Sequence, residues 1–387
     1  MDGRRLLVGL AITTCLSLAI GSAPMASLPG ASPASATFAA RRHPRITVAF
    51  TGDFLATHAT WEAASRNAGG RGYDFEPMVR RLGTLTRSAD LAICHLETPL
   101  TGSGVPLRDY PRYAVPHQLA DAIHRAGYDG CSTASNHSLD HGLAGIRTTL
   151  RKLDSLGVGH TGTARSACEA ARHHAVPGRQ GHDRAPLVHG VVQRAPARPR
   201  VGSEPHRCRA DRHKGPSCPP AWRRDRPAQS ALGHRAPAPA EHRHPPTAVQ
   251  TALARRLTAS KTIDLIVGHH AHVVQPIRRV HWRYVAYGLG NSLSGMTAAL
   301  VSPAVQDGIV LLVTFERGPR KWRVRRIRYA PTWVHPGPFV VRLAGPAIDG
   351  GRLAPSVLAE LRRSWRRTVA TADAARLGVV PFRRARL

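Results

Sequence analysis

Short apolar runs of strand length alternate with amphipathic segments of helical spacing on both sides of a long polar stretch. In the N-terminal part, strand-like runs fall at 45–50, 89–97 and 128–133, and helical spacings at 75–85, 115–126 and 142–156. In the C-terminal part, strand-like runs fall at 263–267 and 283–291, a hairpin pattern at 308–315 and 322–329, and helical spacings at 247–260 and 354–375. This alternation of strand and helix predicts an α/β fold.

The pattern stops in the middle of the chain. Residues 168–246 contain no Ile, Phe, Tyr, Met, Thr or Asn and consist mainly of Arg, Ala, Pro, His and Gly. Such a composition cannot supply strands or a core, so it predicts a disordered segment. We therefore divide the chain into an N-terminal part of one domain at 45–167, this Arg/Pro/His/Ala-rich segment at 168–246, a C-terminal part of the same domain at 247–341 and a basic helical tail at 342–387.

The N-terminus has the features of an export signal. Arg4 and Arg5 precede an apolar run at 6–20, and the small residues at 34–36 form an A-x-A cleavage motif. We predict a signal peptide at 1–36 and an exported protein that is extracellular or associated with the cell envelope. Membrane attachment is expected only through an uncleaved signal. Export permits disulfides, but Cys94 and Cys131 end apolar runs, and we interpret them as buried small hydrophobic residues rather than a disulfide.

The charge balance favours an anionic partner. The chain carries 55 Lys and Arg against 24 Asp and Glu, a formal charge of +31. The excess is mostly arginine, and no zinc-finger or RRM signature accompanies it. Nucleic acid is therefore disfavoured, and an anionic polymer or the envelope machinery is the expected partner.

Candidate metal ligands follow the predicted strands. Carboxylates, imidazoles and an amide oxygen are the donors with which proteins hold two divalent ions that activate water. We expect two such ions, drawn from Mn, Fe, Zn and Mg, and the expected ligands are Asp53, Glu97, Asn136, His137, His269 and His272. His137 and Asp140 are the candidate catalytic residues, with Asp140 holding a histidine in position.

Most of these residues also have a purely structural interpretation. Asp53 can cap a helix, Glu97 can be a solvated turn residue, and Asn136 can cap the helix that begins near His141. His137 alone is typical of a structural histidine, and Asp140 can simply begin the same helix. Three histidines within four positions after an apolar strand are rarely packing residues, so the strongest signal comes from 269–272, where we expect at most two of the three to face a site.

Taken together, these motifs resemble the CapA family of poly-gamma-glutamate (capsule) synthesis proteins, whose fold is related to the calcineurin-like metallophosphatases. The motifs are TGD at 51–53, LETP at 96–99, NHSLD at 136–140, GHHAHVVQP at 268–276 and YGLGN at 287–291. The resemblance covers about 45–165 and 247–335. It implies a four-layer α/β/β/α sandwich of metallophosphatase type, metal-site loops at strand ends, and His269 and His272 as the ligands of the second histidine loop.

One element of the family pattern is missing. CapA-like proteins carry His-Trp-Gly-x-Glu at the end of a buried strand before the second histidine loop, and no such motif stands here in frame. Residues 230–236 (SALGHRA) back-translate with GC-rich codons to TCTGCACTGGGGCACCGAGCA, which reads Leu-His-Trp-Gly-Thr-Glu once the first nucleotide is dropped. The same shift at 178–189 permits a buried-strand pattern. We hypothesise a frameshift from about 168–173 to about 244–249, and the alternative is a genuine basic insertion.

These observations favour an exported CapA-like protein that acts in capsule or poly-gamma-glutamate synthesis or export. A catalytic form would carry out metal-assisted hydrolysis or transfer at a phosphate or an acyl/amide bond. The missing loop predicts an incomplete metal site, which leaves the enzymatic activity of this chain open. The alternative function is a non-catalytic envelope component that binds an anionic polymer.

Overall fold

The computed structural model describes residues 44–166, 169–170, 242–260, 263–319, 321–373 and 377–382. The chain divides into two compact units at Arg42, and every described residue belongs to the second unit, His43–Leu387. The predicted signal peptide, nearly all of the segment 168–246 and both stretches that suggest a frameshift lie outside the described residues.

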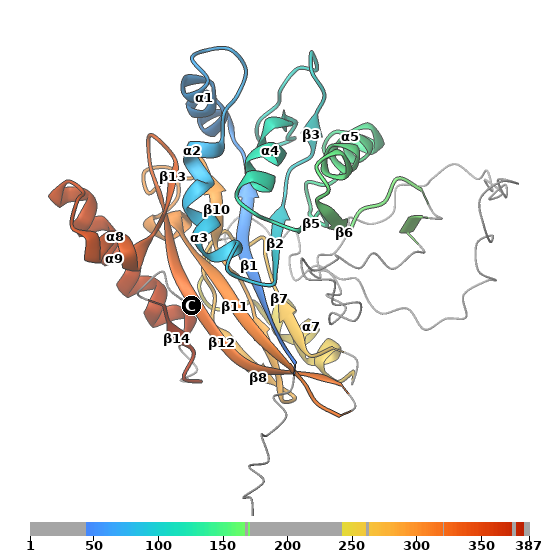
Figure 1. Cartoon of the computed structure of the whole chain (residues 1–387), viewed down its shortest axis with the longest axis vertical. Coiled ribbons are helices and arrows are strands. Elements are labelled where there is room, and N and C mark those ends of the chain that lie inside the picture. The colour runs from blue at the N-terminus through green and yellow to red at the C-terminus, as the bar shows by residue number, and fades with distance from the viewer. Residues whose placement is uncertain are drawn as a thin grey trace, which may run out of the picture. The chain divides into compact units, whose positions relative to one another are not determined.

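The described residues form strands and helices in a mixed order (Figure 1). In the first half these are β1 (Arg45–Leu55), α1 (His58–Asn67), α2 (Glu76–Val79), the 3-10 turn η1 (Arg80–Leu82), α3 (Gly83–Thr86), β2 (Leu91–Leu96), β3 (Leu100–Thr101), β4 (Val115–Pro116), α4 (Gln118–Arg125), β5 (Gly130–Ser132), α5 (Gly142–Ser155) and β6 (Gly159–Thr161). In the second half they are α7 (Ala248–Thr258), β7 (Leu265–Val267), β8 (Ile277–Val280), β9 (Arg283–Ala286), β10 (Asn291–Ser294), the 3-10 turn η2 (Pro303–Gln306), β11 (Asp307–Arg317), β12 (Trp322–His335), β13 (Val340–Leu343), α8 (Ala344–Gly350), α9 (Pro355–Ala372) and β14 (Val380–Pro381).

Strand β1 lies at the centre of a nine-stranded mixed sheet. The strands follow the order β13-β12-β11-β1-β2-β5-β6, with β10 also paired to β1 and β14 to β12. One edge of β1 pairs antiparallel with β11 from Arg45 to Thr51 and then parallel with β10 from Asp53 to Leu55. The partner of β1 therefore changes at Asp53, and in open α/β sheets such a change of direction opens the crevice where ligands bind.

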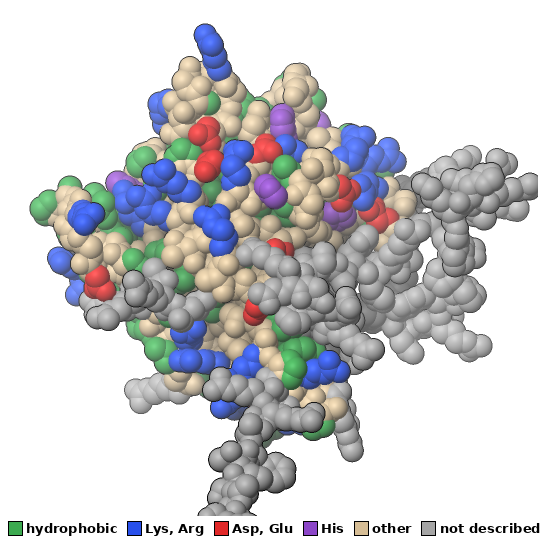
Figure 2. All heavy atoms as spheres, viewed as in Figure 1, with side chains coloured by type: hydrophobic (Ala, Val, Ile, Leu, Met, Phe, Trp, Pro, Cys, Tyr) green, Lys and Arg blue, Asp and Glu red, His purple; other side chains and the backbone are tan. Residues whose placement is uncertain are grey.

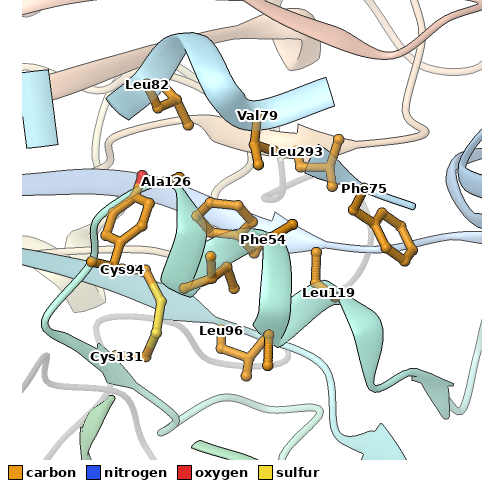
Figure 3. Close-up of a cluster of buried hydrophobic side chains, with 14 of the residues drawn as sticks. Phe54, Phe75, Val79, Leu82, Cys94, Leu96, Leu119, Ala126, Cys131 and Leu293 are labelled. Atoms are coloured by element: carbon orange, nitrogen blue, oxygen red, sulfur yellow. A yellow bond between two sulfur atoms is a disulfide. The ribbon is translucent and has the colours of Figure 1, made fainter. Parts of the chain in front are cut away.

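One face of this sheet packs against the helices of the first half. Phe54 of β1 meets Phe75, Val79 and Leu82 from the α2–η1 region and Leu119 of α4 in the largest cluster of buried apolar side chains (Figure 3). Phe54, Phe75 and Leu82 are fully buried. Burying a side chain of this size contributes about 1.5–3 kcal/mol, so this face anchors β1 beneath the helices.

The other face packs against a second, three-stranded sheet. This sheet has the order β7-β9-β8, and a second cluster joins Val48 and Leu311 of the large sheet to Val267, Ile277 and Ala286 of the small one. A third cluster lies between the small sheet and α7 and includes Ala254, Leu257, Ile266 and Val285. The α/β class predicted from the sequence is confirmed. Within the described ranges, no helix is both long and apolar enough to cross a bilayer.

Several predicted elements differ from the structure at their ends. The predicted helix at 75–85 is divided into α2, η1 and α3, and the one at 115–126 begins only at Gln118 because Val115 and Pro116 pair with β3. The strand predicted at 45–50 continues to Leu55, so Asp53 lies within it. The sequence pattern did not predict α1 or the strands β3, β6, β8, β10, β13 and β14. Helix α1 buries only one large side chain, Trp61, and gives a weak apolar period.

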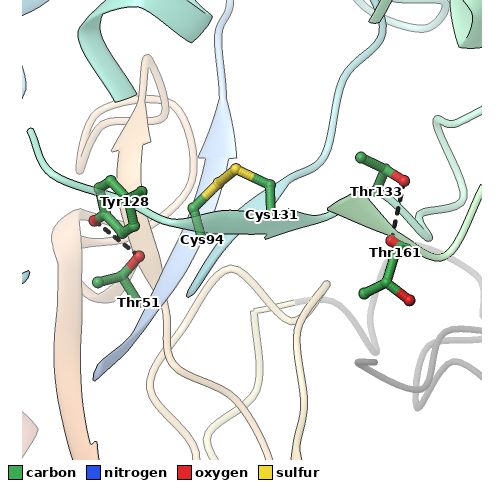
Figure 4. The surroundings of a disulfide bond; sticks show 6 residues. All are labelled: Thr51, Cys94, Tyr128, Cys131, Thr133 and Thr161. Atoms are coloured by element: carbon green, nitrogen blue, oxygen red, sulfur yellow. Dashed lines mark hydrogen bonds between the residues drawn. A yellow bond between two sulfur atoms is a disulfide. The ribbon is translucent and has the colours of Figure 1, made fainter. Parts of the chain in front are cut away.

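The prediction for Cys94 and Cys131 is wrong, because the structure joins them in a disulfide (Figure 4). Both residues are buried and are register partners on the neighbouring parallel strands β2 and β5. Hydrogen bonds flank the disulfide, from the Tyr128 hydroxyl to Thr51 at 3.0 Å and from Thr133 to the Thr161 carbonyl at 3.1 Å. The apolar pattern of each run does not predict this pairing, because only the register of β2 against β5 places the two cysteines opposite one another.

Candidate metal centre

The structure brings Asp53 to the middle of a buried polar cluster. Asp53 is paired in register with His95 of β2 on one side and Asn291 of β10 on the other. Its side chain is 1% exposed. The backbone N–H of Asp53 donates to the Gly290 carbonyl at 2.9 Å, which fixes the carboxylate at the point where β1 changes partner.

Two glycines let backbones meet closely below this cluster. A Cβ on Gly52 would lie 2.2 Å from the Gly290 carbonyl oxygen, and one on Gly268 would lie 2.2 Å from the Tyr287 carbonyl oxygen. No side chain fits at either position. The glycines in TGD and GHHAH therefore allow β1 and β7 to deliver Asp53 and His269 to one place.

The loop after β7 surrounds the Asp53 carboxylate. Nδ1 of His269 lies 2.6 Å from Oδ1 of Asp53, while Oδ2 accepts a hydrogen bond from the His270 backbone N–H at 3.1 Å and lies 3.3 Å from Nδ1 of His272. His270 and His272 adopt left-handed backbone conformations, with φ of 80° and 54°. These turns bring all three histidines into the buried cluster, whereas the sequence analysis expected at most two to face it.

Two groups of side chains in the described residues can each hold a metal ion. The first is Asp53, His95 and His269, and the second is Glu97, His270 and His272. Within each group the potential ligand atoms all lie within 4.8 Å of one another, and all six residues are buried. Nε2 of His272 lies 3.6 Å from Oε1 of Glu97, and the rings of His95 and His269 stack at 4.1 Å.

The electrostatics of the first group favour an ionised Asp53 carboxylate beside a neutral His95 imidazole. Burial acts to raise the pKa of Asp53, but His269, together with His95 and His272, outweighs it and lowers that pKa below its usual range. Burial, and then repulsion from His269, lowers the pKa of His95 well below its usual value. A charged carboxylate and neutral ring nitrogens are the protonation states in which these groups bind metal.

Asn291 holds one of the histidines in place. Its Oδ1 lies 3.0 Å from Nδ1 of His272, and its Nδ2 donates to the carbonyl oxygens of Val305 at 2.9 Å and of His272 at 3.3 Å. With both amide hydrogens directed at carbonyls, Oδ1 accepts from the imidazole, so Nε2 of His272 is directed toward Glu97.

His95, His270 and Asn291 belong to the centre, although the sequence pattern does not identify them. His95 had a readable signal: it stands two positions before Glu97, and side chains two apart along a strand share a face. The resemblance to the CapA family favours His269 and His272 over His270, and nothing in the sequence predicts the two left-handed residues that turn this loop into the cluster. Asn291 was part of a motif, but only the pairing of β10 with β1 shows what it contacts.

The remaining predicted residues form a second unit near Glu97. Nδ1 of His137 lies 2.6 Å from Oδ2 of Asp140, which also accepts the Tyr113 backbone N–H at 2.8 Å. The Tyr113 ring packs edge-on against His137 at 4.7 Å, and burial together with Asp109, Glu97 and Asp140 raises the pKa of Tyr113. Of the residues that the structure describes, His137 and Asp140 belong to neither metal-binding group.

Asn136 lies beside this unit rather than at a helix end. Its Oδ1 accepts a hydrogen bond from the Ser135 hydroxyl at 3.1 Å. The residue that caps α5 is His141, and no side-chain hydrogen bond accompanies that cap. Asn136 therefore does not cap the helix.

The donor set fits divalent metal ions. Taking two carboxylates and four imidazoles out of water is unfavourable unless they are paired or bind an ion. Carboxylate oxygens and neutral imidazoles suit Mn, Fe and Zn, and three donors per group leave coordination positions for water or substrate.

Comparison with known proteins agrees with this arrangement. A family model described as "Bacterial capsule synthesis protein PGA_cap" matches residues 47–214 and 238–296, more than half of the chain. The chain belongs to this capsule synthesis family. The match includes all six residues of the two metal-binding groups, three in its first part and three in its second. It omits 215–237, where the His-Trp-Gly-x-Glu motif would stand.

Two curated relatives come from Sinorhizobium fredii (strain NBRC 101917 / NGR234). They are Uncharacterized protein y4sH and Uncharacterized protein y4uA, which are 31% and 29% identical to this chain over 102 residues. Each match covers 24% of this chain and 22% of the relative, so the chain spans under a quarter of the length of either.

Proposed function

We propose that this chain is an exported member of the capsule synthesis family that acts in the synthesis or export of poly-gamma-glutamate or a similar anionic polymer through a two-metal centre of metallophosphatase type. The observation that carries the proposal is the convergence of Asp53, Glu97 and four histidines from strands far apart in the sequence into two adjoining groups. A buried cluster of this composition has no simple packing role.

The proposed fold is a four-layer α/β/β/α sandwich. Three clusters of buried apolar side chains support it: one between the helices of the first half and the nine-stranded sheet, one between the two sheets, and one between the small sheet and α7. In such a sandwich the strand ends of both sheets meet at one edge, which is where Asp53 and His269 are found.

In the proposed mechanism the metal-binding groups and the His137–Asp140 pair have separate tasks. When bound, the metal ions would act as Lewis acids and lower the pKa of bound water. Asp140 holds Nδ1 of His137, which leaves Nε2 to exchange a proton with a phosphate or acyl/amide substrate. Asn291 holds His272, and Asp53 contacts residues of both groups, so this carboxylate connects them.

The same proposal includes an incomplete centre. A His-Trp-Gly-x-Glu loop from the shifted segment would add a further imidazole and carboxylate near the cluster, and its absence would lower metal affinity and turnover. The exported, envelope-associated location rests on the signal-like N-terminus and on membership of a capsule synthesis family. The disulfide between Cys94 and Cys131 supports an oxidising compartment.

Metal content and phosphodiester hydrolysis test this function together. Purified chain incubated with Mn²⁺ is expected to retain close to two ions after gel filtration and to hydrolyse bis(p-nitrophenyl) phosphate. His137→Ala is expected to keep the metal and lose at least a hundredfold in kcat, as for removal of a general acid–base. His58→Ala, an exposed histidine on α1, is the matched control.

A second result would favour the alternative function. If the chain retains no metal, hydrolyses nothing and binds soluble poly-gamma-glutamate, then it is a non-catalytic component that binds an anionic polymer, and the proposed metal centre is wrong.

A further inference from the structure

The strand ends opposite the metal centre bring two turns together. Arg45 begins β1 and pairs with Glu316 near the end of β11 at 2.7 Å. Asp264, directly before β7, pairs with Arg283 at the start of β9 and lies 3.9 Å from Lys321 in the β11–β12 turn. The β8–β9 turn and the β11–β12 turn therefore lie side by side. We call the residues Arg45, Arg279, Trp282, Lys321, Arg323 and Arg325 the strand-start surface.

Trp282 is presented outward at the tip of this surface. Trp282 is the most exposed large hydrophobic residue in the described part of the chain, with 83% of its surface exposed. His281 and Trp282 form the two-residue turn between β8 and β9, and both are left-handed, with φ of 45° and 66°. Glycine and asparagine are the residues that such a turn favours. The backbone at Trp282 is strained for a residue with a side chain, and its indole buries almost nothing, so packing within the domain does not explain a tryptophan here.

Cationic groups surround this indole. The Arg279 guanidinium lies 5.8 Å from the Trp282 ring centre and 5.0 Å from that of Tyr284. Arg279, Arg323 and Arg325 are exposed, and the nearby carboxylates Asp264 and Glu316 already have cationic partners. Figure 2 shows Lys and Arg side chains beside apolar ones at the lower end of the view, where Figure 1 places β8 and the β11–β12 turn. The surface is therefore net positive around an exposed aromatic ring.

The described chain also begins at this end. The Pro44 carbonyl oxygen accepts a hydrogen bond from the Arg317 backbone N–H at 2.9 Å. The described domain therefore continues into residues 1–43 of the sequence from the strand-start surface.

We propose that the strand-start surface binds the anionic phospholipid headgroups of a bilayer, with Trp282 in the interfacial zone. Tryptophan is favoured at this zone because its ring is apolar and its N–H is polar, and arginines nearby are attracted to anionic lipids. A soluble polyanion would use the arginines but gains little from an outward indole. Eight residues of extended strand separate Arg45 from Asp53, about 26 Å at 3.3 Å per residue, so the metal centre faces away from the bilayer.

Vesicle binding of the full chain tests the location of Trp282. The vesicles contain phosphatidylglycerol and phosphatidylcholine, with a nitroxide-labelled lipid at headgroup depth. Residues 1–43 contain no tryptophan, so tryptophan quenching does not report on the N-terminal run. We expect quenching in the wild type and its loss in Trp282→Phe. Equal quenching in both chains would overturn the proposal.

Charge variants test the lipid preference. Each arginine near an anionic surface contributes roughly a fivefold change in partitioning, so Arg279→Gln with Arg323→Gln is expected to weaken binding on the order of twentyfold. The matched control is Arg147→Gln with Arg151→Gln, two exposed arginines on α5. An equal loss in both pairs, or equal binding of the wild type to pure phosphatidylcholine, would overturn the proposal. The chain could instead bind soluble poly-gamma-glutamate, lose this binding in Arg279→Gln with Arg323→Gln, and show no preference for anionic vesicles. That result would identify the surface as a polymer site and overturn the proposal.

Discussion

Asp53 and His269 are 216 positions apart in the sequence, yet Oδ1 of one and Nδ1 of the other lie 2.6 Å apart in the fold. The other carboxylate oxygen of Asp53 faces His270 and His272, which belong to the second metal-binding group. The two oxygens of this carboxylate therefore face different groups, which makes Asp53 a link between them.

Asp53→Asn is expected to lower the binding of both metal ions, because an amide removes the charge that the two groups share. His95→Gln removes a ligand from the first group alone and is expected to leave close to one ion bound. Elemental analysis of the purified variants after Mn²⁺ loading measures both stoichiometries. His58→Gln serves as the control, and equal losses in Asp53→Asn and His95→Gln would contradict a connecting role for Asp53.

The metal-free chain is expected to lose stability as the pH falls below about 6.5. Burial and His269 lower the folded-state pKa of His95 from its ordinary value of 6.5, so the unfolded chain takes up a proton that the folded chain does not. Stability is present above the unfolded pKa and declines by up to about 1.4 kcal/mol per pH unit for one proton. Asp53, whose folded pKa is also lowered, adds to this loss below about its ordinary value of 3.8.

Urea unfolding in EDTA at a series of pH values checks this dependence. His95→Gln removes the titrating group and is expected to flatten the decline between neutral pH and about pH 5. The exposed His58→Gln should keep the wild-type slope. An unchanged slope in His95→Gln would show that other groups control the acid response.

The disulfide between Cys94 and Cys131 is expected to stabilise the fold by about 4 kcal/mol, from the loss of unfolded-chain entropy across its sequence separation of 37. Unfolding with and without reductant measures the difference in the wild type. Cys94→Ala with Cys131→Ala is the control, since a reductant should no longer change its stability. A large reductant effect in this double variant would assign the stabilisation to other cysteines.

Arg367 fixes α9 to the large sheet through a buried carboxylate. Its Nε and Nη2 donate to Asp307 at 2.6 and 2.8 Å, and the Asp307 side chain is 1% exposed. Burial raises the pKa of Asp307 even with this partner present. Arg367→Met leaves the carboxylate buried without its partner and is expected to lose about 3–5 kcal/mol at neutral pH.

Two further variants separate the lost charge pair from lost packing. Asp307→Asn added to Arg367→Met removes the buried charge and should recover much of the loss. The deficit of Arg367→Met should also shrink as the pH falls, because protonation neutralises Asp307. Arg363→Met changes an exposed arginine on the same helix and should alter stability by less than about 0.5 kcal/mol. Equal losses at positions 363 and 367 would contradict the role of Asp307.

The sequence predicts the parts of this fold that depend on local pattern and misses those that depend on pairing. Apolar runs at 89–97 and 263–267 predict buried strands because a run of that kind needs burial wherever it lies. The disulfide could not be predicted from the runs, because it follows from the register of β2 against β5. Likewise, His270 enters the centre through two left-handed residues in one loop, a backbone feature without a side-chain period.

The frameshift hypothesis predicts the nucleotide sequence between the codons of residues 168 and 249. The bases for 230–236 should read Leu-His-Trp-Gly-x-Glu in the shifted frame, and the bases for 178–189 should encode a buried strand in that same frame. The family match gives evidence on both sides, because it omits 215–237 but includes 178–189 as written. A stop codon in the shifted frame would end the hypothesis and leave a genuine basic insertion.

If the frame holds, a chain with the frame restored should bind Mn²⁺ more tightly than the chain as written, because an added imidazole and carboxylate increase the number of donors around the Asp53 cluster. Equal affinity of the two chains would show that the segment contributes no ligand.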